Sequence, residues 1–332
     1  MPEVSVLLTC SGQRVDIVRA FRAALDAGPH TGRVLVSDAD ELSPSRYAAD
    51  AVVELPLVDD PSYGAAVAEV CRRKGVRAVV PLTDLDPVIL ARAKDLVEAA
   101  GGHVFVPDPE VAHGCQDKWR CHLMLTRHGL PSPPTWLGGE ADLADLPYPV
   151  RTKAVFGYAG RHIHRCDDAA QLAFFLDYIP EPVVIQADLS HATEFSIDCL
   201  GDLSGRPLGA VPRSMIQGNG REQIKGETLD DPRLVELGAT VVERLGIVGP
   251  CTIQGFRDDA GEILGITDIN TRFGGGFPLP QAAGAGYPQK IIAMAAGETV
   301  RPALGEHRAG VVMTRFLDQT FLLRGDGGLT RM

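Results

Sequence analysis

Four residues in the last third of the chain have the types and spacing of a metal and phosphate site. The segment "GITDINTRFGGG", Gly265–Gly276, reads as a strand whose alternation places Asp268, Asn270 and Arg272 on one face. Gln254 lies on the strand before the turn "RDDAGE", at a distance that lets it face the acid and the amide. Mg²⁺ takes such oxygen ligands, and an arginine can form a fork to a phosphoryl oxygen. We therefore predict a metal-and-phosphate edge, although a solvated hairpin face explains the hairpin alone equally well.

Lysines in three other segments are placed to hold phosphates. Lys153 leaves the strand "PYPVRTK" into a turn with glycine, where backbone N–H groups add to its charge. Lys118 stands on a helix before a domain boundary, and Lys225 is expected in a polar, glycine-rich loop, "QIKGE". Between them, the strand "VVIQADL" offers its backbone to an adenine edge, and Glu194 reaches toward a ribose hydroxyl. Since a lone lysine is usually solvated, the order of these segments is what favours a nucleotide site.

The elements that must position these residues change character along the chain. The first third alternates apolar runs with helical patterns, which predicts βαβ units and a parallel sheet. Its strands end in the polar tips "TCSGQR", "SDAD" and "PLTDLD", where such sheets bind ligands. "SGQR" lacks the G-x-G-x-x-G spacing, so a dinucleotide site is weakly supported. Asp84 and Asp86 either bind an amine substrate or cap the next helix.

A helix from about Pro109 to His128, stopping at Gly129, precedes the extended stretch "LPSPP" and marks a domain boundary. Strands and hairpins dominate after it, with three helices among them.

Composition excludes several classes of protein. The 332 residues suffice for two or three domains, and the net charge of −11 without a basic block argues against a nucleic-acid binder. We find neither a signal-peptide pattern nor an apolar run near the ~20 residues that span a bilayer. The 7 cysteines are scattered and odd in number, which disfavours disulfide frameworks and zinc sites. We expect a cytoplasmic protein without a membrane partner.

Several motifs, taken in order, carry a family resemblance: "DK" at Asp117–Lys118, then "PYPVRTK", "TEFSIDCL", "VPR", "KGET" and "DINTRFGGG". With these motifs the chain resembles the ATP-grasp superfamily, in the branch similar to the carbamoyl-phosphate synthase large subunit. The resemblance implies a mixed α/β and α+β fold: a Rossmann-like parallel-sheet domain over residues 1–112, a small subdomain with a glycine-containing lid over 113–185, and a large subdomain with the magnesium and phosphate site over 186–332. The two subdomains would clasp ATP.

The resemblance also assigns roles to residues, with ATP and Mg²⁺ (or Mn²⁺) as cofactors. The implied nucleotide contacts are Lys118, Lys153, Gln186, Ala187, Asp188, Leu189, Glu194 and Lys225. The implied metal ligands are Gln254, Asp268 and Asn270, and the implied catalytic residues are Arg272, Lys225 and Asn270. Three features depart from the family pattern: Asp268 stands where Glu is commoner, Thr271 replaces a proline, and Tyr158 and His162 make the lid loop "FGYAGRHIH" bulkier.

The function implied is an ATP-dependent ligase that activates a small carboxylate, such as an amino acid, as an acyl phosphate for attack by an amine or another nucleophile. One alternative is an enzyme that phosphorylates bicarbonate, as carbamoyl-phosphate synthase does. Another, motivated by the altered lid, is a nucleotide-binding protein without catalysis. The expected partners are small-molecule carboxylate and amine substrates, and an apolar N-terminal helix face makes a homodimer plausible.

Overall fold

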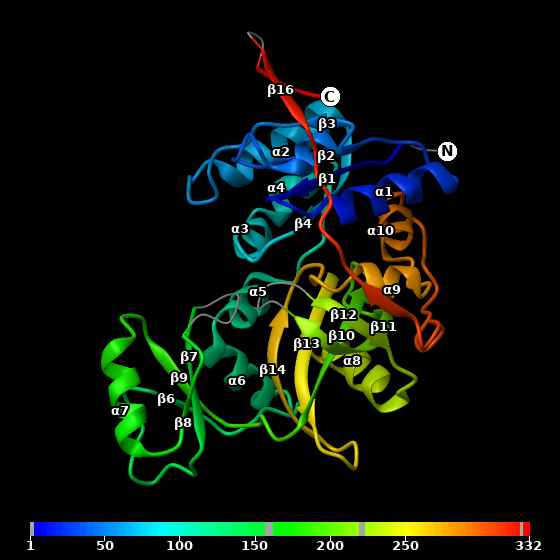
Figure 1. Cartoon of the computed structure of the whole chain (residues 1–332). Coiled ribbons are helices and arrows are strands. Elements are labelled where there is room, and N and C mark those ends of the chain that lie inside the picture. The colour runs from blue at the N-terminus through cyan, green and yellow to red at the C-terminus, as the bar shows by residue number, and fades with distance from the viewer. Residues whose placement is uncertain (1–2, 157–161, 219–222, 326–327) are drawn as a thin grey trace.

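The computed structural model describes residues 3–156, 162–218, 223–325 and 328–332. The strands of these residues form sheets of five, four, six and two strands. In Figure 1 the five-stranded sheet lies at the top, and the four- and six-stranded sheets lie next to each other below it. Among the described residues, no helix is both long and apolar enough to cross a membrane.

The N-terminal sheet is parallel in the order β3-β2-β1-β4-β5. Its strands are β1 (Ser5–Thr9), β2 (Val34–Val36), β3 (Ala51–Val52), β4 (Val76–Pro81) and β5 (His103–Val104). The helices between them are α1 (Val15–Ala27), the short 3₁₀ helix η1 (Pro44–Tyr47), α2 (Tyr63–Lys74), α3 (Pro87–Arg92) and α4 (Lys94–Ala99). The strand order reverses between β1 and β4, which creates the crevice where open parallel sheets bind ligands.

Alternation along the central strands buries both faces of this sheet. On β1, Leu7 packs into the cluster that includes α2, whereas Val6 and Leu8 pack into a second cluster with α1. That second cluster also takes in Tyr287 and Ile291 of α10 (Tyr287–Ala295) from the far end of the chain. The N-terminal sheet and the C-terminal helices therefore share one core.

The single helix predicted from Pro109 to His128 is wrong in detail, because two helices occupy this segment. They are α5 (Pro109–Gln116) and α6 (Lys118–Arg127). Asp117 between them is extended, and its carboxylate accepts a hydrogen bond from the backbone N–H of Arg120 at 2.9 Å. This N-cap starts a new helix with Lys118 at its first position.

The small sheet is antiparallel in the order β6-β9-β7-β8 and is covered by α7 (Ala169–Tyr178). Its strands are β6 (Thr135–Leu137), β7 (Val150–Ala154), β8 (His164–Cys166) and β9 (Val183–Ala187). On β7, Val150, Thr152 and Ala154 are buried, so Arg151 and Lys153 alternate onto the other face. Strand β9 crosses residue 185, and the division of the chain at 112 and 185 stays a prediction.

The large sheet is antiparallel in the order β14-β13-β10-β11-β12-β15. Its strands are β10 (Thr193–Gly201), β11 (Pro207–Gly218), β12 (Gln223–Thr228), β13 (Gly249–Arg257), β14 (Ile263–Asn270) and β15 (Val312–Thr314). The amphipathic helix α8 (Pro232–Leu245) packs its buried face on β10 and β11. The predicted hairpin is therefore the pair β13–β14, at one edge of this sheet.

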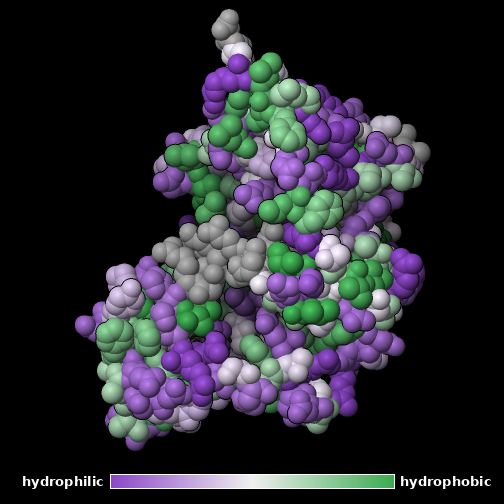
Figure 2. Space-filling view, viewed as in Figure 1, coloured by the Kyte–Doolittle hydropathy of each residue, from purple (hydrophilic) through white to green (hydrophobic). Residues whose placement is uncertain are grey.

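The C-terminal segment runs back to the N-terminal sheet. After α9 (Pro278–Ala282), α10 and β15, the chain forms the hairpin of β16 (Leu322–Gly325) and β17 (Gly328–Arg331). Arg324 pairs with Glu41 at 3.1 Å, and Arg331 donates to the carbonyl of Tyr47 at 3.1 Å. Figure 1 shows this red segment rising past the N-terminal strands. On the face in Figure 2, hydrophilic residues predominate and hydrophobic ones are dispersed among them.

Candidate functional site

A cavity of about 1110 Å³ lies between the small sheet and the large sheet, below the tip of β4. It is lined by most of the residues named from the sequence: Lys118, Lys153, Gln186, Ala187, Leu189, Glu194, Gln254, Asp268, Asn270 and Arg272. Asp188 and Lys225 are the two that do not line it. The fold thus brings together side chains from four separate segments of the chain.

The metal edge, which we define as Gln254, Asp268, Asn270 and Arg272, is assembled by the register of β13 and β14. Gln254 lies directly opposite Asp268 in the antiparallel ladder. The side-chain amide of Asn270 donates to Gln254 Oε1 at 3.4 Å, and Arg272 donates to Asn270 Oδ1 at 3.1 Å. The four side chains therefore form one row on the cavity wall, as the alternation predicted.

The donors of the metal edge suit a hard cation. Among the described residues, no hydrogen bond or ion pair engages the carboxylate of Asp268, so its oxygens are available to a ligand. The described residues hold no group of three His, Cys, Asp or Glu side chains that could bind a metal. One carboxylate with two amide oxygens is instead a donor set for Mg²⁺, which shares its coordination shell with substrate phosphates.

Lys153 of β7 is a partly buried lysine on the cavity wall. Its Nζ donates to Gln186 Oε1 at 2.7 Å, and Gln186 Nε2 in turn donates to Thr135 Oγ1 at 3.1 Å. Burial lowers the pKa of Lys153 to about 8, and nearby Lys118 lowers it too, although Asp268 opposes the shift. An anion in the cavity would therefore raise this pKa again and stabilise the charged form of the lysine.

Asp188 is held by arginines rather than facing the cavity. Its carboxylate accepts from Arg151 Nε and lies 3.3 Å from Arg165 Nε. Burial alone would raise the pKa of Asp188, but hydrogen bonds from Ser190 and Arg151 keep it below its usual value. This pairing fixes the end of β9 and the turn after it, where Gln186, Ala187 and Leu189 line the cavity. The segment expected to contact adenine is therefore anchored from behind.

Glu194, at the start of β10, also lines the cavity. Burial raises the pKa of its carboxyl group, and the positive charges of Arg213 and Lys153 oppose that shift. A carboxylate in this position can accept hydrogen bonds from hydroxyl groups of a ligand.

The expectation that Lys225 lies in a loop is wrong. Lys225 is exposed within β12, where its Cα pairs with Gln217 on one side and Thr314 on the other. Pairing on both sides outweighs the local glycine pattern, since ladder hydrogen bonds satisfy the backbone. Most of the predicted lid, residues 157–161 with Tyr158 among them, lies outside the described residues.

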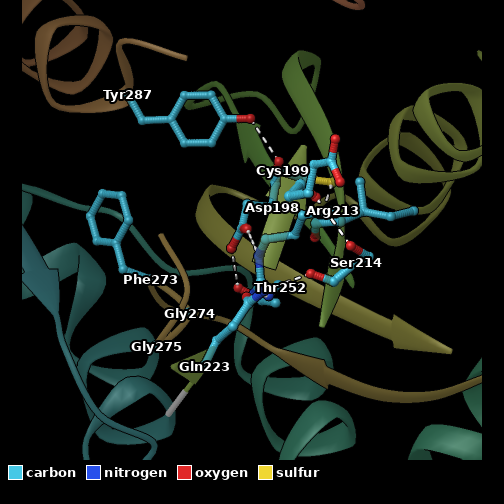
Figure 3. Close-up of polar contacts among 12 residues, drawn as sticks. Asp198, Cys199, Arg213, Ser214, Gln223, Thr252, Phe273, Gly274, Gly275 and Tyr287 are labelled. Atoms are coloured by element: carbon cyan, nitrogen blue, oxygen red, sulfur yellow. Dashed lines mark hydrogen bonds and ion pairs between the residues drawn. The ribbon is translucent and has the colours of Figure 1, made fainter. Parts of the chain in front are cut away.

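A buried arginine that was given no role from the sequence lies next to the metal edge. Arg213 of β11 donates from Nε to Asp198 Oδ2 at 2.6 Å and from Nη1 to Gln223 Oε1. Asp198 Oδ1 accepts from Thr252 Oγ1 at 2.8 Å. We call Asp198, Arg213, Gln223 and Thr252 the arginine network; Figure 3 shows these side chains converging from four strands. The signal in the sequence was the "VPR" motif: a guanidinium in an apolar strand needs an acid partner.

The arginine network explains two of the three glycines in "FGGG". A Cβ on Gly274 would lie 2.9 Å from Asp198 Oδ1, and a Cβ on Gly276 would lie 2.6 Å from Arg213 Cζ. The loop therefore passes directly over the network, and both Gly274 and Gly276 line the cavity. Any larger residue here would displace the network or the loop.

The crevice of the N-terminal sheet does not have the geometry of a dinucleotide site. The backbone N–H of Gly12, in the turn after β1, donates to Asp38 Oδ2 at 2.6 Å. In a dinucleotide fold this turn presents its N–H groups to the pyrophosphate. An internal carboxylate takes that position here, which agrees with the missing glycine fingerprint.

The sheets and the cavity between them have the arrangement of an ATP-grasp fold, and the comparisons agree. Residues 181–317 match a family described as "ATP-grasp in the biosynthetic pathway with Ter operon". Residues 6–105 match the family "PylC-like, N-terminal domain". Residues 181–317 thus match an ATP-grasp family, and the resemblance and the fold class predicted from the motifs are confirmed at this level. A search of curated proteins finds no match.

Solved structures share the fold at low sequence identity. The biotin carboxylase domain of 2-oxoglutarate carboxylase from Hydrogenobacter thermophilus, solved with MgADP, ADP and bicarbonate, has a TM-score of 0.72 at 19% identity, covering 94% of this chain and 74% of that one. N5-carboxyaminoimidazole synthetase from Staphylococcus aureus, complexed with ADP, has a TM-score of 0.72 at 16% identity, covering 95% and 82%. L-amino acid ligase from Bacillus licheniformis has a TM-score of 0.71 at 19% identity, covering 93% and 78%. The predicted ligase class and the ATP and Mg²⁺ cofactors agree with these findings.

Proposed function

We propose that this chain is an ATP-dependent ligase that phosphorylates a small carboxylate, most simply that of an amino acid, and joins the acyl group to a nucleophile with release of ADP and phosphate. The observation that carries the proposal is the register of β13 and β14, which sets Gln254 against Asp268 on the wall of a cavity that also contains Lys118 and Lys153. Carboxylate, amide and ammonium groups in this arrangement bind a metal–triphosphate.

The cavity has room for more than one ligand. Its volume of about 1110 Å³ exceeds the range of about 300–1,000 Å³ typical of a site for one small molecule. A nucleotide clasped between the two sheets would leave space toward the tip of β4 for the carboxylate substrate. The reaction needs both in contact.

The residues of the cavity supply position and charge rather than covalent chemistry. Mg²⁺, when bound at the metal edge, neutralises phosphate oxygens. Lys153 and Lys118 hold the phosphates, and Arg272 steadies the transferred phosphoryl group as the carboxylate oxygen attacks and ADP leaves. The nucleophile then attacks the carbonyl carbon of the acyl phosphate, the bond from that carbon to the phosphate oxygen breaks, and phosphate leaves. An amine nucleophile gives up one proton to phosphate or water.

The direct test is ADP release with a panel of amino acids, singly and in pairs, with condensation products identified by mass spectrometry. We expect ADP formation that depends on Mg²⁺ and on at least one carboxylate. If no mixture releases ADP from folded protein that binds MgATP, the ligase proposal is wrong and a nucleotide-binding role replaces it.

A second candidate is phosphorylation of bicarbonate, because a similar structure was solved with bicarbonate and MgADP. Bicarbonate carries the same reacting group as a carboxylate and needs the same metal edge. ADP release that depends on bicarbonate alone, without an amino acid, would favour this candidate over the first.

A further inference from the structure

One ion pair joins the N-terminal sheet to the metal edge. Asp84 follows β4 at the tip of the sheet, and its Oδ2 accepts from Arg272 Nη2 at 2.9 Å. Both side chains line the cavity. The carboxylate of Asp84 is 38% exposed, so a ligand in the cavity has access to it.

The backbone around Asp84 is fixed, which holds the carboxylate at the cavity wall. Gln116, the last residue of α5, donates from Nε2 to the carbonyl of Asp84 at 2.6 Å. The neighbouring Asp86 has no exposed surface and instead accepts from the hydroxyl of Tyr63 at 2.8 Å. Of the two acids noted in "PLTDLD", only Asp84 is therefore presented to a ligand.

Asp84 differs in position from the other carboxylates that line the cavity. Three carboxylates of described residues line the cavity: Asp84, Glu194 and Asp268. Asp268 belongs to the metal edge, and Glu194 lies on β10, beyond the turn that would face adenine. Asp84 lies at the other end, and its partner Arg272 is the group that must turn to the transferred phosphoryl oxygens in the proposed reaction. When Arg272 does so, Asp84 loses its cation and can take another.

We propose that Asp84 binds the amino group of the second substrate, so that the nucleophile is an amine rather than a thiol or an alcohol. This inference rests on the proposed function. Arg272 Nη2 is 2.9 Å from Asp84 and 3.1 Å from Asn270 Oδ1. The guanidinium of Arg272 alone thus separates the metal ligand Asn270 from Asp84, and an amine bound to Asp84 lies beside the acyl phosphate that it attacks. The ammonium form of an amine donates to a carboxylate in a bond in which both partners are charged, whereas a thiol or an alcohol brings no positive charge of its own. The bound ammonium gives up one proton to water or phosphate before it attacks.

The test compares Asp84→Asn, which keeps the shape and removes the charge, with Asp84→Glu, which keeps the charge. Asp59→Asn is the matched control, because Asp59 is an exposed acid of the same domain that does not line the cavity. The wild-type reaction is first run on pairs of amino acids, and fragmentation of the product in a mass spectrometer shows which one supplied the amine. KM is then measured for the amine, the carboxylate and ATP separately.

We expect Asp84→Asn to raise KM for the amine by about 10- to 100-fold, the worth of a hydrogen bond to a charged group. KM for ATP should stay near the wild-type value, and Asp84→Glu should recover part of the affinity for the amine. Thermal melting checks that each variant is folded, and Asp84→Ser replaces Asp84→Asn if the amide variant does not fold.

The outcomes separate the two proposals. Wild-type product with an unchanged KM for the amine in Asp84→Asn overturns the role of Asp84 and leaves the ligase intact. A rise in KM for ATP alone, or for the carboxylate alone, also overturns it. No product from any pair with wild-type protein overturns the proposed function, and the role of Asp84 with it.

Discussion

The metal edge and the arginine network lie on the same six-stranded sheet, yet their bonding differs sharply. In the arginine network, Asp198 accepts bonds of 2.6 Å from Arg213 and 2.8 Å from Thr252, and both charged side chains are almost fully buried. In the metal edge, the bonds are 3.1 and 3.4 Å long, and the carboxylate of Asp268 accepts no hydrogen bond from the described residues. One group is satisfied by the protein itself, and the other is arranged for a ligand.

The difference teaches where stability and function are placed in this sheet. Buried charges must be fully paired, so the arginine network has one geometry and couples four strands to it. In the metal edge, a carboxylate and two amides converge at the cavity wall, which lowers the stability of the protein until a cation binds there. The arginine network lies under Gly274 and Gly276, in the loop that follows Arg272 of the metal edge. The network therefore supports this loop.

The largest expected effect is on activity, at the metal edge. Asp268→Ala removes the one anionic metal ligand, and we expect ADP release to fall by at least about 10³-fold. The melting temperature should not fall, because no described residue bonds to this carboxylate. Asp259→Ala, an exposed acid on the turn of the same hairpin, is the matched control. Full activity in Asp268→Ala would show that this row of side chains binds no metal.

The reverse pattern is expected in the arginine network. Asp198→Asn leaves the guanidinium of Arg213 buried without its counter-charge, which should lower the free energy of unfolding by about 3 kcal/mol. Urea denaturation measures the change, and removing the exposed pair of Arg301 and Glu306 should shift the midpoint little. If Asp198→Asn unfolds no more easily than wild type, the network is not the stabilising group.

The sequence predicted these two groups unequally, for physical reasons. The metal edge lies on one hairpin, so alternation and turn length place Gln254 opposite Asp268 without knowledge of the fold. The arginine network needs the register of four strands that are distant in sequence, and no local pattern contains it. "VPR" was visible as a motif, but the partners of Arg213 were not.

Lys225 shows that a local pattern can also give a wrong prediction when distant strands decide the structure. Its neighbours, "GNGREQIKGET", have the composition of a loop, and local propensity favoured that interpretation. Strand β15, which arrives much later in the chain, pairs with β12 and makes Lys225 part of a sheet. The parallel N-terminal sheet was easier to predict, because each of its strands and helices has its own apolar pattern.

A smaller effect on stability is expected where the loop crosses the network. Gly276→Ala would place a methyl group 2.6 Å from Arg213 Cζ, and overpacking of this kind should cost about 2 kcal/mol. Gly139→Ala is the control, because nothing lies within 4 Å of a Cβ at that loop position. Equal unfolding midpoints for the two variants would mean that the loop can move away from the network, and that the support inferred for Arg272 is absent.

The smallest effect is a pH dependence, which tests whether Lys153 serves the ligand, as the metal edge does, or only the structure. Burial lowers its pKa to about 8 in the free protein, so the lysine loses its charge as pH rises through that value. In the unfolded chain, Lys153 keeps its proton up to its ordinary pKa of 10.5, and the free energy of unfolding therefore rises with pH between about 8 and 10.5.

Phosphate binding needs the charge of Lys153 and changes in the opposite sense: kcat/KM for ATP should fall about tenfold per pH unit above about 8. Lys153→Arg stays charged throughout this range, so its profile should lack that alkaline limb. An unchanged limb in Lys153→Arg would assign the titration to another group, and Lys153 would then act as a structural partner of Gln186 rather than as a phosphate contact.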